Sequence, residues 1–505
     1  MKILDIPAIK ECDRYTVVHE PVASVDLMER AANALKSWLM VHDIVKAKNI
    51  KIFCGMGNNG GDGLALARLL SYSDISSEVY LLRLSERFSP DCETNYLRIK
   101  DIECVKIFEL FTEADFPVID TADVVIDAVL GSGLNKPLQG VMAQLAEYLN
   151  DIDAVKIAVD IPSGMFADRV QPCDAAAVKT DYTLTFQFPK LSFLFAENDS
   201  IVGEWHVLDI GLHRDFIDAV ETDNFFTTED VVRPILRSRP KFSHKGTYGH
   251  ALLVAGSEGM SGACLLSAES CMRSGTGLLT VHLPSSVALP LMSYLPEAMS
   301  EIDSCQSHNT AVGDLSRYTA IGMGPGLGRH SDTAAMIKSV LRDADVPIVL
   351  DADALNILSD NKTWLEFLPA GTILTPHPKE FERLFGTCAD SLQRLDLQRK
   401  MAMRYNIIIV LKGAYTSVMM PNGKCFFNST GNPGMAKAGS GDVLTGIILS
   451  LLAQHYSPEE AAVLGVYVHG LAGNVAASRH GMYGMLSSDI SECLGDAFLE
   501  IAGRQ

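Results

Sequence analysis

The 505-residue sequence contains no Cys-x-x-Cys pair, although its 11 cysteines are scattered along the whole length. This argues against a zinc site and against a disulfide framework. The sequence also lacks an apolar run of the ~20 residues that cross a bilayer. Asp5 and Pro7 interrupt the N-terminal segment before the apolar core of a signal peptide can form. We therefore expect a cytoplasmic protein without a membrane partner.

Positive charge is also scarce. Lysine and arginine number 42 against 62 aspartates and glutamates, which gives a formal net charge of -20. Such a chain repels nucleic acid and anionic membranes. A phosphate ligand must then be bound locally, for example by backbone amides at a helix N-terminus. We expect small-molecule substrates, no nucleic-acid partner and a homo-oligomer.

Short apolar runs that read as strands alternate with helical patterns punctuated by glycine, which is typical of α/β folds with parallel sheets. A polar stretch at 222–239 interrupts the alternation. We therefore predict two α/β domains with a boundary near residue 225: a Rossmann-like doubly wound sheet in 1–222 and a second α/β domain in 226–505. The predicted strands are 50–54, 79–84, 124–130, 156–160 and 183–188 in the first domain, and 251–255, 278–283, 320–324, 348–351, 373–375 and 407–411 in the second.

The first glycine-rich loop, GMGNNGGDG at 55–63, lies between a predicted strand and a predicted helix. Gly55, Gly57 and Gly60 satisfy G-x-G-x-x-G, which alone is a weak signal. The next predicted strand does not end on the acidic residue that holds a ribose in dehydrogenases, which weakens a dehydrogenase interpretation. A tight structural turn explains the glycines but not two asparagines and an aspartate among them. We favour a ligand-binding loop.

Two further strand ends carry polar side chains. Asp127 precedes the glycine-rich turn GSGL, and Asp160 and Ser163 belong to VDIPSG. The carboxyl ends of strands in an open sheet form the ligand crevice. Asn59, Asp127 and Ser163 are hard oxygen donors that suit an alkali-metal cation, which leaves Asp160 for proton transfer. Either aspartate taken alone could equally be a helix cap or a turn residue.

The strongest signal is GNPGMAKAGSGD at 431–442, which precedes an apolar helix. Small residues allow successive amides to form an anion-binding helix start that stabilises a transferred phosphoryl group. Asp442 is placed to take a proton from an attacking hydroxyl. An ordinary helix cap is the alternative. The sequence has no G-x-x-x-x-G-K-[ST] loop that would provide a competing nucleotide site.

Several segments upstream support this site. Residues 412–416 follow a strand, where a lysine and backbone amides can hold phosphates. His377 lies between two prolines, a rigid setting that suits either a substrate-orienting ring or a structural histidine. The segments SGAC (261–264) and GMGPGLG (322–328) are turns that allow close ligand approach or only relieve backbone strain.

At this point the chain resembles a known family. GNNGGDG, VIDAVLGSGL and VDIPSG, in this order and spacing, resemble the epimerase domain of the NAD(P)H-hydrate repair enzymes over most of 1–220. HKGTYGHALLVAGS, GMGPGLG, TPHPKE, KGAYT and NPGMAKAGSGD resemble the ADP-dependent dehydratase domain of that family, a member of the ribokinase-like superfamily, over roughly 240–490. Lys379 departs from the family pattern, which has glycine there.

The resemblance implies that residues 1–222 interconvert the R and S epimers of hydrated NADH and NADPH. It implies potassium binding by Asn59, Asp127 and Ser163. We expect Asp160 to be the acid/base, with Asp127 as the alternative. The implied substrate contacts are Asn58, Asn59, Gly60, Gly61, Asp62, Gly131, Ser132, Gly133, Leu134, Asn135, Lys136, Pro137 and Asp160.

For residues 226–505 the resemblance implies dehydration of the S epimer at the expense of ADP, which yields AMP and phosphate and restores NAD(P)H. Asp442 would be the base when ADP phosphorylates the hydrate hydroxyl. Mg²⁺ is expected, with Asp351 and Asp353 as candidate ligands or mere turn residues. The implied substrate contacts are Ala263, Gly326, His377 and Asp442, the ADP contacts are Lys412, Gly413, Ala414, Tyr415 and Thr416, and the AMP contact is Gly441.

Two other hypotheses stay open at this point. A small-molecule kinase would explain AGSGD but would leave the first domain without a function. Alternatively, the first domain could be a non-catalytic nucleotide sensor or a protein-binding module, since one fold hosts many functions.

Overall fold

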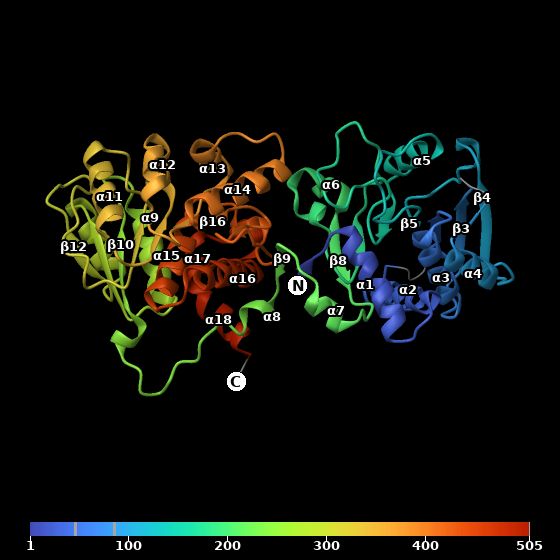
Figure 1. Cartoon of the computed structure of the whole chain (residues 1–505), viewed down its shortest axis with the longest axis horizontal. Coiled ribbons are helices and arrows are strands. Elements are labelled where there is room, and N and C mark those ends of the chain that lie inside the picture. The colour runs from blue at the N-terminus through green and yellow to red at the C-terminus, as the bar shows by residue number, and fades with distance from the viewer. Residues whose placement is uncertain (45–47, 84–86, 504–505) are drawn as a thin grey trace. The chain divides into compact units, whose positions relative to one another are not determined.

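The computed structural model describes residues 1–44, 48–83 and 87–503, which Figure 1 colours along the chain. The chain forms two compact units. One contains residues 2–222 with 390–392, and the other contains Met1, 223–389 and 393–505. Both units consist of parallel-stranded sheets covered by helices, which confirms the predicted α/β fold class.

The first unit contains a seven-stranded sheet in the order β4-β3-β2-β5-β6-β7-β8, with every neighbouring pair parallel. Its strands are β2 (Ile50–Cys54), β3 (Ser77–Leu82), β4 (Val105–Leu110), β5 (Val124–Ala128), β6 (Val155–Val159), β7 (Tyr182–Phe186) and β8 (Glu204–Leu208), and the two-residue β1 (Lys2–Ile3) precedes them. The strand order changes direction between β2 and β5. The carboxyl ends of these strands therefore flank the crevice where doubly wound sheets bind ligands.

The helices of this unit cover both faces of its sheet. They are α1 (Ile6–His19), α2 (Ser24–Val41), α3 (Asn58–Ser71), α4 (Pro90–Ile99), α5 (Val141–Asn150), α6 (Asp199–Val202), α7 (Arg214–Ala219) and the 3-10 turns η1 (Glu113–Asp115), η2 (Leu191–Leu194) and η3 (Ala196–Asn198). Ile50 and Ile52 pack with α2, α3 and α4 in one core, whereas Phe53 packs with α5 in another. Successive side chains of a strand point to opposite faces, so Ile50, Ile52 and Cys54 fill one layer and Phe53 fills the other.

The second unit has the strand order β9-β18-β17-β16-β15-β14-β13-β10-β11-β12. The pairs β16–β17 and β17–β18 are antiparallel, and the other pairs in this series are parallel. The strands are β9 (Asn224–Thr227), β10 (His250–Val254), β11 (Leu278–Leu283), β12 (Met299–Ile302), β13 (Ala320–Met323), β14 (Ile348–Leu350), β15 (Ile373–Leu374), β16 (Ile408–Leu411), β17 (Ser417–Met419) and β18 (Cys425–Asn428).

Helices also cover both faces of the second sheet, with α11 to α14 along one side and α15 to α18 along the other in Figure 1. The largest core packs β10, β11 and β16 against α9, α15, α16 and α18. The helices are α8 (Glu229–Val232), α9 (Ser261–Arg273), α10 (Ser285–Tyr294), α11 (Ser331–Asp343), α12 (Ala352–Asp360), α13 (Pro378–Phe385), α14 (Ser391–Tyr405), α15 (Ser440–Ala453), α16 (Pro458–Gly484), α17 (Ser487–Glu492), α18 (Leu494–Ala502) and the 3-10 turns η4 (Lys245–Tyr248), η5 (Lys362–Phe367) and η6 (Pro433–Met435).

Among the described residues, α16 is the one helix whose length and apolar composition would allow it to cross a membrane. However, 72% of its apolar window is buried inside the structure. The helix packs against α15 and α18, so the second core accounts for its apolar character.

All the predicted strands occur, with ends that differ by one or two residues. Leu84, the predicted end of one strand, lies outside the described residues. The polar stretch at 222–239, where the predicted alternation lapses, contains β9 and α8. The four-residue strand NFFT is too short for an apolar pattern to reveal it.

Candidate active sites

The first candidate site is a cavity of about 820 Å³ at the carboxyl ends of β2, β5 and β6. Its lining contains most of the predicted epimerase residues, together with side chains from α1 and from the segment that follows β7. The lining residues are Ile9, Lys10, Asp13, Asn58, Asn59, Asp62, Leu130, Gly131, Ser132, Gly133, Leu134, Asn135, Lys136, Pro137, Leu138, Gln139, Met142, Asp160, Phe186, Lys190, Ile210 and Leu212.

The segment 55–63, predicted to be a loop before a helix, is a loop only in its first part, because α3 already begins at Asn58. Asn58, Asn59 and Asp62 therefore lie in the first turns of this helix. A Cβ atom on Gly60 would lie 1.9 Å from the carbonyl oxygen of Gly55, so only glycine fits there. A Cβ atom on Gly61 would lie 2.7 Å from Sδ of Met28. These two glycines therefore face protein, whereas Asn58, Asn59 and Asp62 line the cavity.

Asp160 occupies a strained position at the end of β6. Its φ of +65° lies in the left-handed region, which few residues other than glycine adopt. The carboxylate accepts hydrogen bonds from Lys190 Nζ at 2.8 Å and from Thr185 Oγ1 at 3.2 Å. Burial opposes the charge on Asp160, but Lys190 and these hydrogen bonds outweigh burial and hold its pKa below the ordinary value. Asp160 is therefore ionised at neutral pH.

Two further carboxyl groups in this cavity have raised pKa values. Burial, followed by repulsion from Asp160, raises the pKa of Asp13 to about 6. Burial, followed by repulsion from Asp160 and Asp13, raises the pKa of Asp62 well above its ordinary value. One ionised carboxylate and two carboxyls that retain protons more readily thus share one site. This arrangement is typical of acid/base chemistry.

Asp127 is fully buried beside the cavity, at the end of β5. Its carboxylate accepts from the Ser163 N–H at 2.7 Å and from the Ser163 hydroxyl at 2.6 Å. Burial raises the pKa of Asp127 to about 6, and the bonds from Ser163 limit the rise. No lysine or arginine among the described residues forms an ion pair with Asp127. The amide nitrogen of Asn59 is also buried without a hydrogen-bond partner, and as a donor it is available to an acceptor atom of a ligand.

The second candidate site surrounds Asp442 in the first turn of α15. Gly439 begins this helix with a φ of +92°, and a Cβ atom there would lie 2.5 Å from Leu266 Cδ1, so the turn requires glycine. Burial, followed by repulsion from Asp351, raises the pKa of Asp442 to about 7. A carboxyl that titrates near neutral pH at an anion-binding helix start suits a general base.

Lys412, the first residue of the predicted ADP segment, faces this helix start. Its Nζ donates to Asp351 Oδ1 at 2.8 Å, and Thr445 Oγ1 donates to the other oxygen of Asp351 at 2.7 Å. A Cβ atom on Gly441 would lie 3.2 Å from Lys412 Nζ. The structure thus brings Lys412, Gly441 and Asp442 together, from segments that are far apart in the sequence.

The rest of the ADP segment forms a turn. The Gly413 N–H donates to Thr416 Oγ1 at 3.2 Å, and Thr416 Oγ1 donates back to the Gly413 carbonyl at 3.0 Å. Gly413 and Ala414 are exposed, and Tyr415 is partly exposed. Their backbone groups are accessible to a ligand from solvent.

His377 caps α13 through Nδ1, and its side chain is 43% exposed, so the structural role is compatible with a contact to a ligand. Its Nδ1 accepts the N–H groups of Lys379 and Glu380 and so caps α13, while the Glu380 carboxylate accepts the His377 N–H at 2.8 Å. Lys379 contributes only its backbone N–H to the cap, so the departure from glycine leaves this turn intact. Burial, followed by the charge of Lys412, lowers the pKa of His377 and keeps the ring neutral.

Ala263 and Gly326 face each other at the start of α9. A Cβ atom on Gly326, whose φ is +61°, would lie 3.2 Å from the Cβ of Ala263. The Gly326 carbonyl accepts from Ser257 Oγ at 2.8 Å. The predicted turn SGAC is in fact the beginning of α9, which runs from Ser261 to Arg273, and it faces the glycine turn that contains Gly326.

The sequence did not reveal four residues that the structure adds to these sites. Asp13 and Lys190 line the first cavity, from α1 and from the segment after β7. In the second site, Glu380 lies 4.0 Å from Lys412, and His469 Nε2 lies 3.3 Å from Ser440 Oγ. Only Glu380 belongs to a quoted motif, TPHPKE, and the others stand in ordinary helical or loop patterns.

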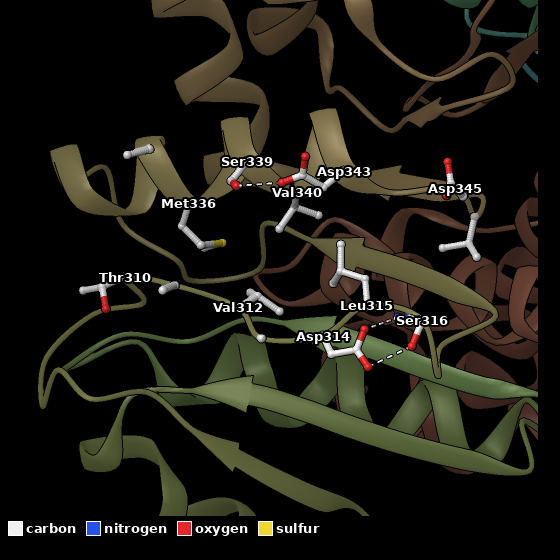
Figure 2. A pocket seen from close by; sticks show the side chains of 14 residues that line it. Thr310, Val312, Asp314, Leu315, Ser316, Met336, Ser339, Val340, Asp343 and Asp345 are labelled. Carbon is white, nitrogen blue, oxygen red and sulfur yellow. Dashed lines mark hydrogen bonds between the residues drawn. The ribbon is translucent and has the colours of Figure 1, made fainter.

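Another cavity, of about 720 Å³, lies between residues 310–316 and α11 (Figure 2). Its carboxylates Asp314 and Asp343 accept hydrogen bonds from the neighbouring Ser316 and Ser339, as the dashed lines show. The described residues that line it include none of the predicted site residues. We assign the chemistry to the two sites above because they contain the groups with raised pKa values.

Comparison with known proteins gives matches for both halves. Residues 251–495 match the family model described as NAD(P)H-hydrate dehydratase, and residues 24–192 match the model described as YjeF-related protein N-terminus. A bifunctional NAD(P)H-hydrate repair enzyme of Moorella thermoacetica is 35% identical over 98% of this chain and 96% of its own. The Escherichia coli enzyme of the same description is 32% identical over 89% of this chain and 84% of its own.

Among solved structures, the ADP/ATP-dependent NAD(P)H-hydrate dehydratase of Bacillus subtilis is 36% identical, covering 55% of this chain and 98% of its own with a TM-score of 0.49. The full-length identity to the curated relatives, together with the two domain matches, decides the family. This chain belongs to the bifunctional NAD(P)H-hydrate repair enzymes, which unite an epimerase domain and a dehydratase domain.

Proposed function

We propose that residues 1–222 interconvert the R and S epimers of hydrated NADH and NADPH, and that residues 226–505 dehydrate the S epimer. The dehydratase half would consume ADP and release AMP and phosphate, which restores NAD(P)H. The observation that carries the proposal is that Asp442, whose pKa is raised to about 7, and Lys412, which is bonded to Asp351, both lie at the start of α15.

In the epimerase cavity, Asp160 is the proposed acid/base. It is ionised because of Lys190 and lies at the cavity wall. Proton transfer needs a donor as well as an acceptor, and Asp13 shares the cavity with a pKa raised to about 6. Asp127 points instead toward Ser163, which makes it the weaker candidate. The substrate would lie between the two asparagines Asn58 and Asn59 and residues 131–137.

Potassium would be held by Asn59, Asp127 and Ser163. Asp127 is buried and has no cationic partner among the described residues, and a monovalent cation would compensate its charge. When bound, the ion would supply a positive charge that orients the substrate beside Asn59. The N–H and the hydroxyl of Ser163 donate to the Asp127 carboxylate and hold it in place.

In the dehydratase site, Asp442 would accept the proton of the hydrate hydroxyl while that oxygen attacks the terminal phosphorus of ADP. AMP leaves, and the hydroxyl oxygen now carries phosphate. Loss of phosphate from carbon, with loss of a proton from the neighbouring carbon, restores the double bond. Backbone amides after Gly439 and the ammonium of Lys412 would stabilise the phosphate oxygens.

The remaining predicted residues would hold the two ligands. Ala263, Gly326 and His377 would contact the substrate, and Gly413 to Thr416 would contact ADP.

In this proposal Mg²⁺ binds to the phosphates of ADP, and Asp351 and Asp353 are not its ligands. Both oxygens of Asp351 accept from Lys412 and Thr445. Asp353 accepts from the Gly328 N–H at 2.9 Å and from Asn356 at 3.2 Å. Lys412 already compensates the charge of Asp351, and the Gly328 N–H and Asn356 hold Asp353 within its own turn, so both act as turn residues in this proposal, the alternative that the sequence left open.

The proposal also includes a cytoplasmic location and a homo-oligomer that acts on small molecules. The net charge of -20 supports small-molecule partners over nucleic acid. Light scattering of the purified protein measures the number of chains in solution.

The deciding experiment follows recovery of the reduced nicotinamide absorbance from chemically hydrated NADPH that contains both epimers. The protein receives K⁺, Mg²⁺ and either ADP or ATP. We expect full recovery with ADP. Asp160→Asn should recover only the S fraction, about half, and Asp442→Asn should recover none while still equilibrating the epimers.

Chromatographic separation of the epimers distinguishes the two activities in each variant. Asp314→Asn, in the cavity of Figure 2, is the matched control and should behave as the unmodified chain. A stable phosphorylated product without recovered absorbance would overturn the dehydratase half in favour of a kinase. An unchanged epimer ratio in the unmodified chain would overturn the epimerase half.

A further inference from the structure

Four side chains of metal-binding type meet outside both candidate sites. Cys305 and His308 lie on the loop that follows β12, and His330 and Asp332 lie at the start of α11. The two pairs form the local patterns Cys-x-x-His and His-x-Asp, separated by more than 20 residues of chain. Neither pattern entered the assignment of the epimerase or dehydratase sites.

The ligand atoms of His308, His330 and Asp332 lie close enough together to share one metal ion, and Cys305 lies beside His308. His308 Nε2 and His330 Nδ1 each lie 3.6 Å from the same oxygen, Oδ2 of Asp332. Ligand atoms of these three residues all lie within 4.8 Å of one another. Cys305 Sγ lies 3.9 Å from His308 Nε2. Bonds of ~2.1 Å in a tetrahedral zinc site separate nitrogen and oxygen ligands by roughly 3.4 Å, so small side-chain rotations would complete the coordination.

The donor set selects among metals. Two imidazoles, a carboxylate and a thiol are ligands of zinc, whereas magnesium and calcium prefer oxygen alone. The Asp332 carboxylate and the Cys305 thiolate would together neutralise a divalent ion. His308 is 17% exposed and His330 is 52% exposed, so the cluster is open to solvent. The rings of the two histidines are stacked at 3.8 Å, which already holds them side by side.

Two internal contacts compete with a metal, and one of them joins Cys305 Sγ to His308 Nδ1 at 3.3 Å. His330 Nδ1 accepts the N–H of Asp332 at 3.3 Å and so caps α11. This hydrogen bond is longer than usual, and a metal–imidazole bond would replace it with a stronger interaction. The loop is anchored independently, because the Glu258 N–H donates to the Ser307 carbonyl at 2.8 Å and Asn309 donates to the Gly256 carbonyl at 2.8 Å.

We propose that Cys305, His308, His330 and Asp332 form a binding site for Zn²⁺. The ion would tie the loop after β12 to the first turn of α11. Since the same loop is bonded to residues 256–258, the bound ion would lie close to the turns that carry Ala263 and Gly326 without belonging to the chemical site.

The test is a titration of the full-length, reduced and metal-free protein with Zn²⁺ in competition with a chromophoric chelator, in excess Mg²⁺. We expect saturable binding that His308→Ala and Asp332→Asn each weaken at least tenfold. His480→Ala and Cys173→Ser remove an exposed imidazole and an exposed thiol elsewhere, and should leave binding unchanged.

Co²⁺ provides a second readout. In the unmodified chain its spectrum should include a thiolate charge-transfer band, which Cys305→Ser should remove while the histidine ligation persists. His308→Ala changes a more buried residue and could weaken zinc binding by misfolding. His330→Ala changes a half-exposed residue, so a loss of binding in this variant reports on the site itself. Zinc binding that is equal in the unmodified chain and in both histidine variants would overturn the proposal, as would no competition with the chelator.

Discussion

Lys190 donates a 2.8 Å hydrogen bond to Asp160, and the lysine side chain is only 1% exposed. This contact keeps one carboxylate ionised in a cavity where Asp13 and Asp62 have raised pKa values. The two residues come from the ends of different strands. Their contact leaves Asp160 able to accept a proton in the proposed epimerase site.

Replacing Lys190 with methionine removes the ammonium but retains most of the volume. Burial of Asp160 is then opposed only by the hydrogen bonds from Thr185 and the Phe186 N–H, so its pKa rises and the carboxylate becomes protonated at a higher pH. We expect the acid limb of the epimerase kcat/KM profile to move to higher pH, with a loss of about 100-fold or more at neutral pH. Lys10→Met is the control, since Lys10 lines the cavity without a described hydrogen bond to Asp160. An unmoved acid limb would contradict the assignment of Asp160.

Asp127→Asn should impair the use of potassium. The substitution preserves the shape of the side chain but removes the buried charge that a cation would compensate. We expect the K⁺ concentration for half-maximal epimerisation to rise about tenfold, or ~1.4 kcal/mol in binding free energy. A KCl titration measures this concentration, with tetramethylammonium chloride added to keep the ionic strength constant. If the K⁺ requirement were the same in both proteins, Asp127 would not be a ligand.

The dehydratase should lose activity as the pH falls through about 7. The pKa of Asp442 is raised to about 7, and a general base must be deprotonated, so kcat/KM declines on the acid side of that value. Asp351→Asn removes the charge that repels Asp442 and releases Lys412 to interact with it. Both effects lower the pKa of Asp442, so the acid limb should move to lower pH. A shift to higher pH would show that another group titrates.

Gly60→Ala tests the close contact between Gly60 and the Gly55 carbonyl at the start of α3. The added methyl group would meet the Gly55 carbonyl at 1.9 Å, and the backbone must shift to accommodate it. Such overpacking costs roughly 1–3 kcal/mol in the free energy of unfolding. Gly57→Ala is the matched control because its Cβ meets nothing within 4 Å, and it should change stability by less than about 0.5 kcal/mol. Thermal unfolding and epimerase activity are the measurements, and equal effects of the two substitutions would refute the steric explanation.

The sequence predicts strand ends well in this protein. Asp127 and Asp160 follow uninterrupted apolar runs, and in parallel sheets such runs are buried on both faces and end at the ligand crevice. The family resemblance added residues 131–137, which the structure places in the same cavity.

Residues that act through tertiary contact were not predictable in this way. Lys190 follows Pro189 in a segment without helical or strand periodicity, and nothing local indicates that its ammonium meets Asp160 30 positions away in the chain. Asp13 lies in α1 among ordinary helical residues. The sequence also left the role of His377 open, because capping by an imidazole depends on how the ring is turned in the structure.

Strand β9 limits where a separately expressed dehydratase half can begin. Residues 224–227 pair in parallel with β18, from Asn224 beside Cys425 to Thr227 beside Asn428. A fragment that begins at residue 226 would lose half of this strand and leave backbone N–H and C=O groups of β18 unpaired. Unpaired strand edges promote association between chains. A separately expressed dehydratase half therefore needs its first residue no later than about 222, even though its family match begins only at residue 251.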